Sequence, residues 1–516
     1  MYPKVKKFFL EFELFNRHPL SYLAVFLVAL ILSSFFQASP HFADPDSFYH
    51  VKISLLTSEL GPLNSLPWLS ATSLAGQFTD HHLLYHVALI PFVKFFPPLV
   101  GMKIASILFA SLVIVVFYWL LQRFNVIGAF WFTLLLLAAN SFVFRINLAK
   151  AQNLAFIFLF IYLYLLLKQK WPWLLALSWI YVWLYGGWPI LLLLSLIYSA
   201  VMVFVNRDSQ SLQRAIKALG LTFLGLAAGL IINPYFPQNV NFYLTQIWEI
   251  AVINYKSTIG VGGEWYGYKP LNLLSNISLV FSTMIVALVF FPTVRQAKDI
   301  KWFLFVVMIV FYILTLKSRR NVEYFVPFAI FWAGWVISQA IKEKRFAGEF
   351  ELLAEFFGKY KLASMLAVVF LAMSVPYIIT RDVYTISTQY HHSFNFDKFK
   401  EASAWLEHNS KPQTIVFHSD WDEFPILFYH NHHNYYLVGL DPTFLFQTNP
   451  DKYWDWQQVT TGGATERLYD IISQSFNADY VFIDRLGHQA MQQNIENNFH
   501  FKRVFQNQES AVYQVL

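Results

Sequence analysis

The sequence predicts a mainly α-helical membrane protein, a polytopic transmembrane bundle of about eleven spans followed by a small α/β domain outside the membrane. The 516 residues are 57% hydrophobic and 13% charged, with a mean hydropathy of +0.44, whereas soluble domains carry about 25% charged residues. Long apolar segments recur up to about residue 380, and each approaches the ~20 residues that cross a bilayer. Residues 381–516 are polar and mixed in character.

The first span covers the apolar run from Leu20 to Phe36, after the basic start MYPKVKK. No small-residue cleavage site clearly follows this run, so we expect an uncleaved first helix rather than a signal peptide. Lys4, Lys6 and Arg17 are expected to hold its start in the cytoplasm, because basic residues favour that side of the membrane.

The membrane domain is expected to cover residues 1–380. Its further spans are predicted at 102–121, 126–144, 148–167, 171–188, 189–206, 217–233, 276–292, 301–316, 322–341 and 362–379. Basic residues such as Arg123, Arg207 and Lys342 fall between alternate spans, which predicts cytoplasmic loops there and an extracytoplasmic C-terminal domain on a plasma (inner) membrane. The stretch 83–97 is short and flanked by prolines, and we expect it to be re-entrant or interfacial.

Residues 381–516 predict the outer α/β domain, because the β-branched runs TIVFH and YVFID alternate with helical patterns such as DKFKEASAWLEHN. The chain has no cysteine, which excludes disulfides, thiol catalysis and Cys-ligated zinc. The net charge of +6 is scattered over short loops, so it indicates membrane topology and not nucleic-acid binding. No internal repeat supports a repeat-built transporter.

The first outer loop, about 39–82, concentrates groups that carry chemistry. Asp44 and Asp46 stand just past the first span, His50 follows, and Asp80 and His81 end the loop as candidates for the acceptor side. Carboxylates and imidazoles together are typical of Mg²⁺ or Mn²⁺ sites and of general-base chemistry. The alternative is a solvated loop in which the two first aspartates cap a following helix, with His81 as an interfacial or hydrogen-bonding residue.

Two later outer segments add further candidates. Glu264 lies in the glycine-rich loop 234–275 and is either a ligand-positioning acid or a solvated one. Arg319 and Arg320 stand at the outer mouth of a span, against the usual charge bias, and arginine suits forked contacts with phosphate oxygens. The alternative for these two arginines is contact with lipid headgroups.

In the outer domain, HSDWDEFP brings Trp421 and Asp422 together, either to recognise an acceptor or as a packed tryptophan beside solvated acids. The nearby HNHH tract matches no zinc spacing.

The order of these motifs resembles the GT-C superfamily of membrane glycosyltransferases, and most of all the catalytic subunit of oligosaccharyltransferases. ADPDSFYH is similar to the family's Asp-containing first outer loop, GEWYGYKP to its E-x-x-P region and RRNVEYFVP to its R-F-x-x-Y-x-x-P span entry. The resemblance implies that Asp46 coordinates a divalent metal or acts as base, with Asp44 beside it. It also implies that Glu264 positions the acceptor and that Arg319 or Arg320 holds the donor phosphate.

Two segments depart from the family pattern. RINLAKAQNLAF carries Lys150 and no carboxylate where the family has a second acidic motif, so a metal loses ligands there and the lysine is itself a candidate for neutralising a phosphate. SDWDEFP replaces W-W-D-Y-G, although Trp421 and Asp422 fall where the family recognises its acceptor.

The expected activity is therefore transfer of a sugar or glycan from a polyprenyl-phosphate or -diphosphate carrier, held in the bilayer, to a protein, lipid or glycan acceptor on the outer face. Two alternatives remain open. One is a transporter or flippase for a lipid-linked or anionic solute, and the other is a catalytically inactive scaffold of the same fold.

Overall fold

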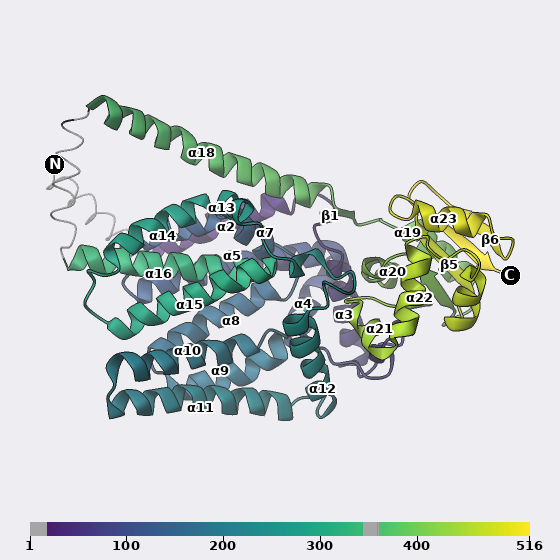
Figure 1. Ribbon diagram of the computed structural model, residues 1–516, viewed down its shortest axis with the longest axis horizontal. Coiled ribbons are helices and arrows are strands. Elements are labelled where there is room, and N and C mark those ends of the chain that lie inside the picture. Colours follow the sequence, from purple (N-terminus) through teal and green to yellow (C-terminus); the bar gives the residue numbers. More distant parts are fainter. Residues whose placement is uncertain (1–17, 344–358, 360) are drawn as a thin grey trace.

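The computed structural model describes residues 18–343, 359 and 361–516, and Lys4, Lys6 and Arg17 lie outside them. Figure 1 shows a long helical bundle with a small mixed domain at one end. The bundle is built from α2 (Pro19–Phe36), α4 (Leu83–Phe95), α5 (Pro98–Arg123), α6 (Ala129–Leu137), α7 (Asn140–Ile146), α8 (Gln152–Leu167), α9 (Trp171–Leu184), α10 (Pro189–Asn206), α11 (Ser209–Ile231), α13 (Pro270–Asn276), α14 (Ser278–Phe290), α15 (Lys298–Lys317), α16 (Val322–Lys342) and α18 (Lys361–His391).

The chain is a multi-pass membrane protein. Among the described residues, six helices are long and apolar enough to cross a bilayer, or eight if the bent pairs α6–α7 (78°) and α13–α14 (92°) each count as one span. Adding the shorter apolar helices α8 and α9 together with α18 gives the eleven segments that the sequence predicts. The segment predicted as re-entrant is α4, a helix of 13 residues that packs against α5 and α9.

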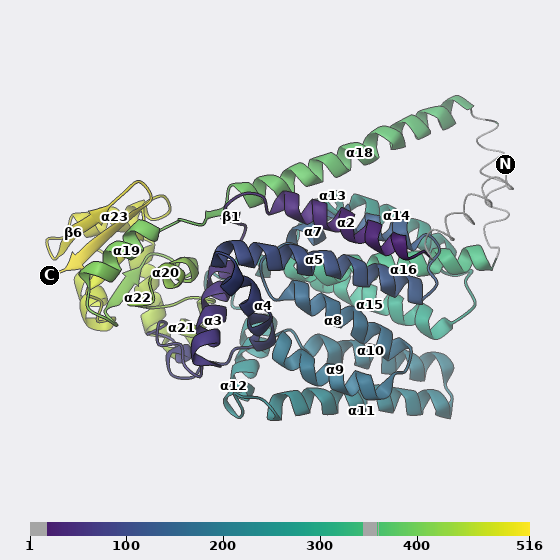
Figure 2. The same cartoon turned by 180° about the vertical axis from the view of Figure 1, so that it is seen from behind.

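The spans differ in how much of their surface the protein covers. In the apolar stretch of the α16 span, 83% of the residues are buried. The helix contacts α6, α7, α14 and α15, so it forms the centre of the bundle. Only 28% of the residues of α2 are buried, which leaves most of its apolar surface for lipid. α18 contacts α2 and α7, and its N-terminal half diverges from the bundle (Figures 1 and 2).

The C-terminal domain confirms the predicted α/β character. Its strands are β3 (Ile415–His418), β4 (Tyr435–Tyr436), β5 (Tyr480–Asp484), β6 (Phe501–Gln506) and β7 (Ser510–Val515). They form one sheet in the order β4-β3-β5-β7-β6, in which β3 is parallel to β4 and β5 while β7 is antiparallel to both neighbours. The helices around it are α19 (Lys400–Asn409), α20 (Phe424–His430), α21 (Thr443–Thr448), α22 (Pro450–Thr460) and α23 (Gln489–Glu496).

The first outer loop joins this domain to the bundle. β1 (His41–Phe42) pairs with β2 (Phe394–Asn395), and α3 (Asp46–Leu60) packs against α20. Residues 68–71 run beside β4, where the backbone N–H of Tyr436 donates to the carbonyl of Trp68 at 2.8 Å. The first outer loop, which carries Asp44 and Asp46, is therefore fixed both by the strand pair β1–β2 and by its contacts with α20 and β4.

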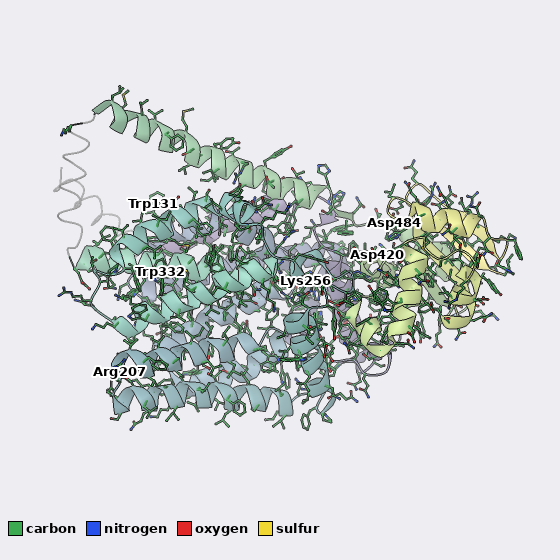
Figure 3. All side chains as sticks on the ribbon, viewed as in Figure 1. Trp131, Arg207, Lys256, Trp332, Asp420 and Asp484 are labelled. Atoms are coloured by element: carbon green, nitrogen blue, oxygen red, sulfur yellow. The ribbon has the colours of Figure 1, made fainter. Side chains whose placement is uncertain are left out.

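The outer loop 234–275 lies at the same end of the bundle. It contains α12 (Gln238–Leu244), a π-helical stretch (Thr245–Ile253) and a 3-10 turn (Gly263–Trp265). Figure 3 shows Arg207 at the end of the bundle away from Asp420 and Asp484. The loop predicted to be cytoplasmic and the C-terminal domain thus lie at opposite ends.

Candidate functional site

Lys150 joins the two acids of the first outer loop. Its Nζ lies 2.7 Å from Oδ2 of Asp44 and 2.8 Å from Oδ2 of Asp46. The backbone N–H of Asp46 also donates to Oδ1 of Asp44 at 3.0 Å, so the turn before α3 presents both carboxylates on one side. The three side chains are 15% (Lys150), 24% (Asp44) and 29% (Asp46) exposed, which leaves the cluster open to a ligand.

The charges and burial of this cluster allow Asp46 to be either protonated or ionised near neutral pH. Burial raises the pKa of Asp46 to about 6, and Asp44 adds to the rise while Lys150 opposes it. Burial would lower the pKa of Lys150, but the two carboxylates outweigh that effect and hold the pKa above its ordinary value. Lys150 is therefore a permanent cation, and Asp46 changes its charge near neutral pH.

A second charged cluster lies beside the first. Nη1 of Arg145, on α7, donates to Oε2 of Glu264 at 3.1 Å, and its Nε donates to Oε2 of Glu323, the buried acid at the start of α16. Nη1 of Arg320 lies 3.5 Å from Oε1 of Glu264. Burial would raise the pKa of Glu264, but Arg320, Arg145 and Lys150 together lower it well below its ordinary range.

The two arginines at the mouth of α16 occupy different environments. Arg320 is 30% exposed, and its guanidinium lies over the ring of Trp265 at 4.8 Å, a stacking that orients the planar group. Arg319 is exposed, and its backbone N–H donates to the carbonyl of Tyr266 at 2.9 Å. The structure thus places Arg320 in the charged cluster and Arg319 at its rim.

The residues present do not fit the divalent metal that the sequence suggested at Asp46. The ammonium of Lys150 occupies the position between Asp44 and Asp46 that a cation would take. Within the described part of the chain, no group of three His, Asp or Glu side chains is arranged to hold a metal ion. In the structure, Lys150 is the cation that pairs with these two carboxylates.

The C-terminal domain brings Trp421 and Asp422 toward the bundle. The Trp421 ring faces loop 234–275, since a Cβ added to Gly262 would lie 3.7 Å from it. Burial, together with the nearby charges of Asp420, Asp46 and Asp44, raises the pKa of Asp422 to about 7, and Lys398 opposes the rise.

Asp80 and His81 lie deeper than the sequence suggested. Asp80 is 4% exposed and its carboxylate is bonded to His86, while the His81 ring packs 5.1 Å from Phe242. Burial lowers the pKa of His81 to about 4 and keeps it neutral. Their predicted contact with an acceptor stays a prediction. In the HNHH tract, His432 contacts Lys52 and His433 contacts the Ser410 carbonyl, so the imidazoles do not converge.

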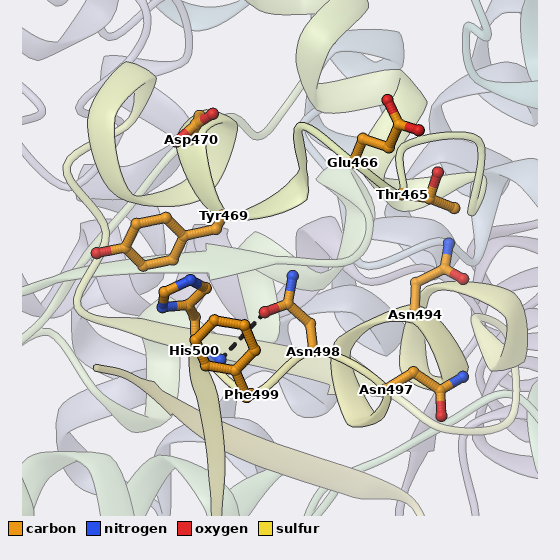
Figure 4. A pocket seen from close by; sticks show the side chains of 9 residues that line it. All are labelled: Thr465, Glu466, Tyr469, Asp470, Asn494, Asn497, Asn498, Phe499 and His500. Atoms are coloured by element: carbon orange, nitrogen blue, oxygen red, sulfur yellow. Dashed lines mark hydrogen bonds between the residues drawn. The ribbon is translucent and has the colours of Figure 1, made fainter.

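The C-terminal domain also has a shallow depression of about 570 Å³. Figure 4 shows its polar and aromatic lining, which includes Tyr469, Asn494 and Phe499. α23 and β6, which flank it, lie at the end of the domain away from the bundle (Figure 1). This depression is separate from the charged clusters.

Sequence reasoning missed two members of the site. Glu323 lies inside the predicted span 322–341 and was not named as a candidate. An acid within an apolar span nevertheless indicates a buried partner of opposite charge. His86 was hidden within the apolar segment 83–97, four residues after His82.

No family model and no curated protein matches the sequence. Solved structures match its fold at low identity. ArnT from Cupriavidus metallidurans bound to undecaprenyl phosphate is 14% identical, with a TM-score of 0.56 over 95% of this chain and 97% of that chain. Its apo form is also 14% identical, with a TM-score of 0.53 over 95% and 96%. The arabinofuranosyltransferase AftD from Mycobacteria is 12% identical, with a TM-score of 0.53 over 96% of this chain and 40% of that one. The chain therefore shares its overall fold with these proteins, a polytopic helical bundle with a small sheet domain at the C-terminal end, as the sequence predicted.

Proposed function

We propose that this protein is a membrane glycosyltransferase that moves a sugar or glycan from a polyprenyl-phosphate or -diphosphate carrier to an acceptor on the outer face of the membrane. The observation that carries the proposal is the group of three cations, Arg145, Lys150 and Arg320, set among carboxylates where the bundle meets the C-terminal domain. The fold shared with ArnT, whose structure holds undecaprenyl phosphate, supports a carrier of this class.

The donor phosphate would bind at Arg320, because this residue has the longest ion pair of the three cations. Arg320 meets Glu264 at 3.5 Å, longer than the 3.1 Å contact of Arg145 with the same carboxylate. Phosphate oxygens form forked, charge-assisted bonds with a guanidinium. A phosphate would thus compete with Glu264 for Arg320. Lys150 would stabilise the negative charge that develops as the phosphate leaves.

The acceptor would enter between Asp46 and the C-terminal domain. Asp46 accepts a hydrogen bond from the attacking group, and so orients or deprotonates it while it forms a bond to the anomeric carbon and the bond to phosphate breaks. Trp421 and Asp422 border this side, which supports their predicted role in acceptor binding. The protein supplies Lys150 where related chemistry uses a metal, so we propose a reaction without a divalent ion.

The proposed orientation has the N-terminus in the cytoplasm and the C-terminal domain outside. It is supported by the position of Arg207, at the end of the bundle away from that domain (Figure 3). Lipid-linked sugars presented at the outer surface would then reach the charged clusters directly.

The test is transfer of radiolabelled sugar from a panel of undecaprenyl-phosphate and undecaprenyl-diphosphate donors by purified protein in lipid nanodiscs. We expect Asp46→Asn and Arg320→Met to abolish transfer, and Lys317→Met, which removes an exposed cation at the same mouth, to retain it. Absence of transfer from every donor by folded wild-type protein would refute the proposal in favour of a transporter or an inactive scaffold.

A further inference from the structure

Three buried polar side chains, two from the first outer loop and one from α4, form a continuous hydrogen-bonded chain. Oδ2 of Asp80 lies 2.7 Å from Nδ1 of His86, and Nε2 of His86 lies 2.8 Å from Nδ1 of His50. These residues are 4%, 0% and 5% exposed respectively. Buried polar groups are costly unless they are paired, so a chain of three in one place calls for a role.

The hydrogen bonds determine where the protons lie. Oδ1 of Asp80 accepts the backbone N–H of His82 at 3.0 Å and its Oδ2 faces His86, a pattern that suits an ionised carboxylate. His86 therefore carries its proton on Nδ1, and its Nε2 accepts the Nδ1–H of His50. Nε2 of His50 is left with a free lone pair, ready to accept a proton.

That lone pair lies beside the candidate site. His50 follows Asp46 by one turn of α3, which places both residues on the same face of the helix. Within the described residues, Nε2 of His50 has no hydrogen-bond partner, and it is not among the fully enclosed polar atoms. Burial lowers the pKa of His50 well below its ordinary value, and the neighbouring His86 lowers it further.

We propose that His50 takes the proton of the acceptor during sugar transfer, with His86 and Asp80 as positioning residues. This role rests on the proposed glycosyltransfer. As the acceptor oxygen bonds to the anomeric carbon and the carbon–phosphate oxygen bond breaks, the acceptor proton moves to Nε2 of His50. The polyprenyl phosphate leaves with the electron pair, and Asp80 stabilises the new imidazolium through His86. Asp46 remains ionised and orients the acceptor.

A weak base is adequate for this step. Transfer at an anomeric carbon has an oxocarbenium-like transition state, so the acceptor oxygen becomes strongly acidic only as the new bond forms. The low pKa of His50 keeps its lone pair available over the whole neutral range. Positioned general bases contribute about 10²- to 10⁴-fold in rate.

Asp80→Asn tests the chain with almost no change in volume. An amide in this position donates to Nδ1 of His86, which reverses both tautomers and places the proton of His50 on Nε2. We expect kcat to fall about 10²- to 10⁴-fold, with the KM for the donor little changed. His433→Gln removes an imidazole bonded to the Ser410 carbonyl in the C-terminal domain and should retain the wild-type kcat. If Asp80→Asn does not fold, His50→Gln tests the same step.

Nitrogen NMR of ¹⁵N-histidine-labelled protein in lipid bilayers reads the tautomers without any donor. Signals are assigned by their loss in His50→Gln and His86→Gln. Nδ1–H forms of His50 and His86 in the wild type, reversed in Asp80→Asn, are the expected result, and an Nε2–H form of His50 in the wild type would overturn the proposal. Correct tautomers with an unchanged kcat in Asp80→Asn would remove His50 from the reaction and leave glycosyltransfer standing. If the wild type transfers no sugar, the proposed function fails and the role of His50 fails with it.

Discussion

Replacement of Lys150 by methionine tests the electrostatic basis of the site. The ammonium lies within 2.7–2.8 Å of both Asp44 and Asp46. It opposes burial, Asp44 and Glu264, which raise the pKa of Asp46 to about 6. Lys150→Met keeps the length of the side chain and removes the charge. Two neighbouring carboxylates then share the site without a cation, and one of them binds a proton more tightly.

The size of the effect follows from the charge that is lost. Removal of an opposite charge at this distance shifts a carboxyl pKa by about 1–3 units. A rise of about 2 units, from about 6 to about 8, lowers the ionised fraction of Asp46 at about pH 7 from ~90% to ~9%, a tenfold loss of active enzyme. Any loss of phosphate binding by Lys150 adds a decrease that does not depend on pH.

The assay is the pH dependence of kcat/KM for labelled-sugar transfer in nanodiscs. Wild-type activity should fall as the pH drops through about 6, because Asp46 must be ionised, and in Lys150→Met this acid limb should move upward by 1–3 pH units. Lys103→Met is the matched control, since Nζ of Lys103 is buried against Gln37 without a carboxylate partner in the described structure. An acid limb that stays near pH 6 in Lys150→Met would show that Lys150 does not control Asp46.

Four further predictions follow from the same geometry. Asp46→Asn should raise the melting temperature at about pH 8 and have little effect at about pH 3, below the unfolded pKa. The folded pKa is raised from 3.8 to about 6, so the stability linked to this group is fully present below pH 3.8 and is lost as the pH rises from there through about 6. Partial exposure reduces the gain to about 1–2 kcal/mol. Glu323→Leu should destabilise the protein by about 3 kcal/mol in thermal unfolding because Arg145 loses a buried partner, and equal stability would contradict a structural pairing. Trp421→Ala should raise the KM for the acceptor and leave the KM for the donor unchanged, as measured by varying each substrate. EDTA should leave transfer unaffected, because Lys150 lies where a metal would bind; loss of activity that Mg²⁺ or Mn²⁺ restores would reject this assignment.

The fold was largely predictable because its signals are local. Each span shows itself by about 20 apolar residues in a row, which no neighbouring segment needs to complete. The sheet of the C-terminal domain follows from short β-branched runs such as those at β3 and β5. The sequence was less informative for α8 and α9, which are 16 and 14 residues long, because packing against α5 and α11 decides where such helices lie.

The sequence by itself determined the membrane bundle, the α/β character of the C-terminal domain and the kinds of group at the candidate site, since carboxylates and arginines between apolar spans are visible one segment at a time. The tertiary structure alone decided their partners. Arg145 meets Glu323 across 178 positions, Lys150 reaches back to Asp44 and Asp46, and His86 joins Asp80 to His50 from within an apolar helix. No local pattern encodes these pairs, because they depend on how distant helices pack and on the cost of burying a charge without a counter-charge.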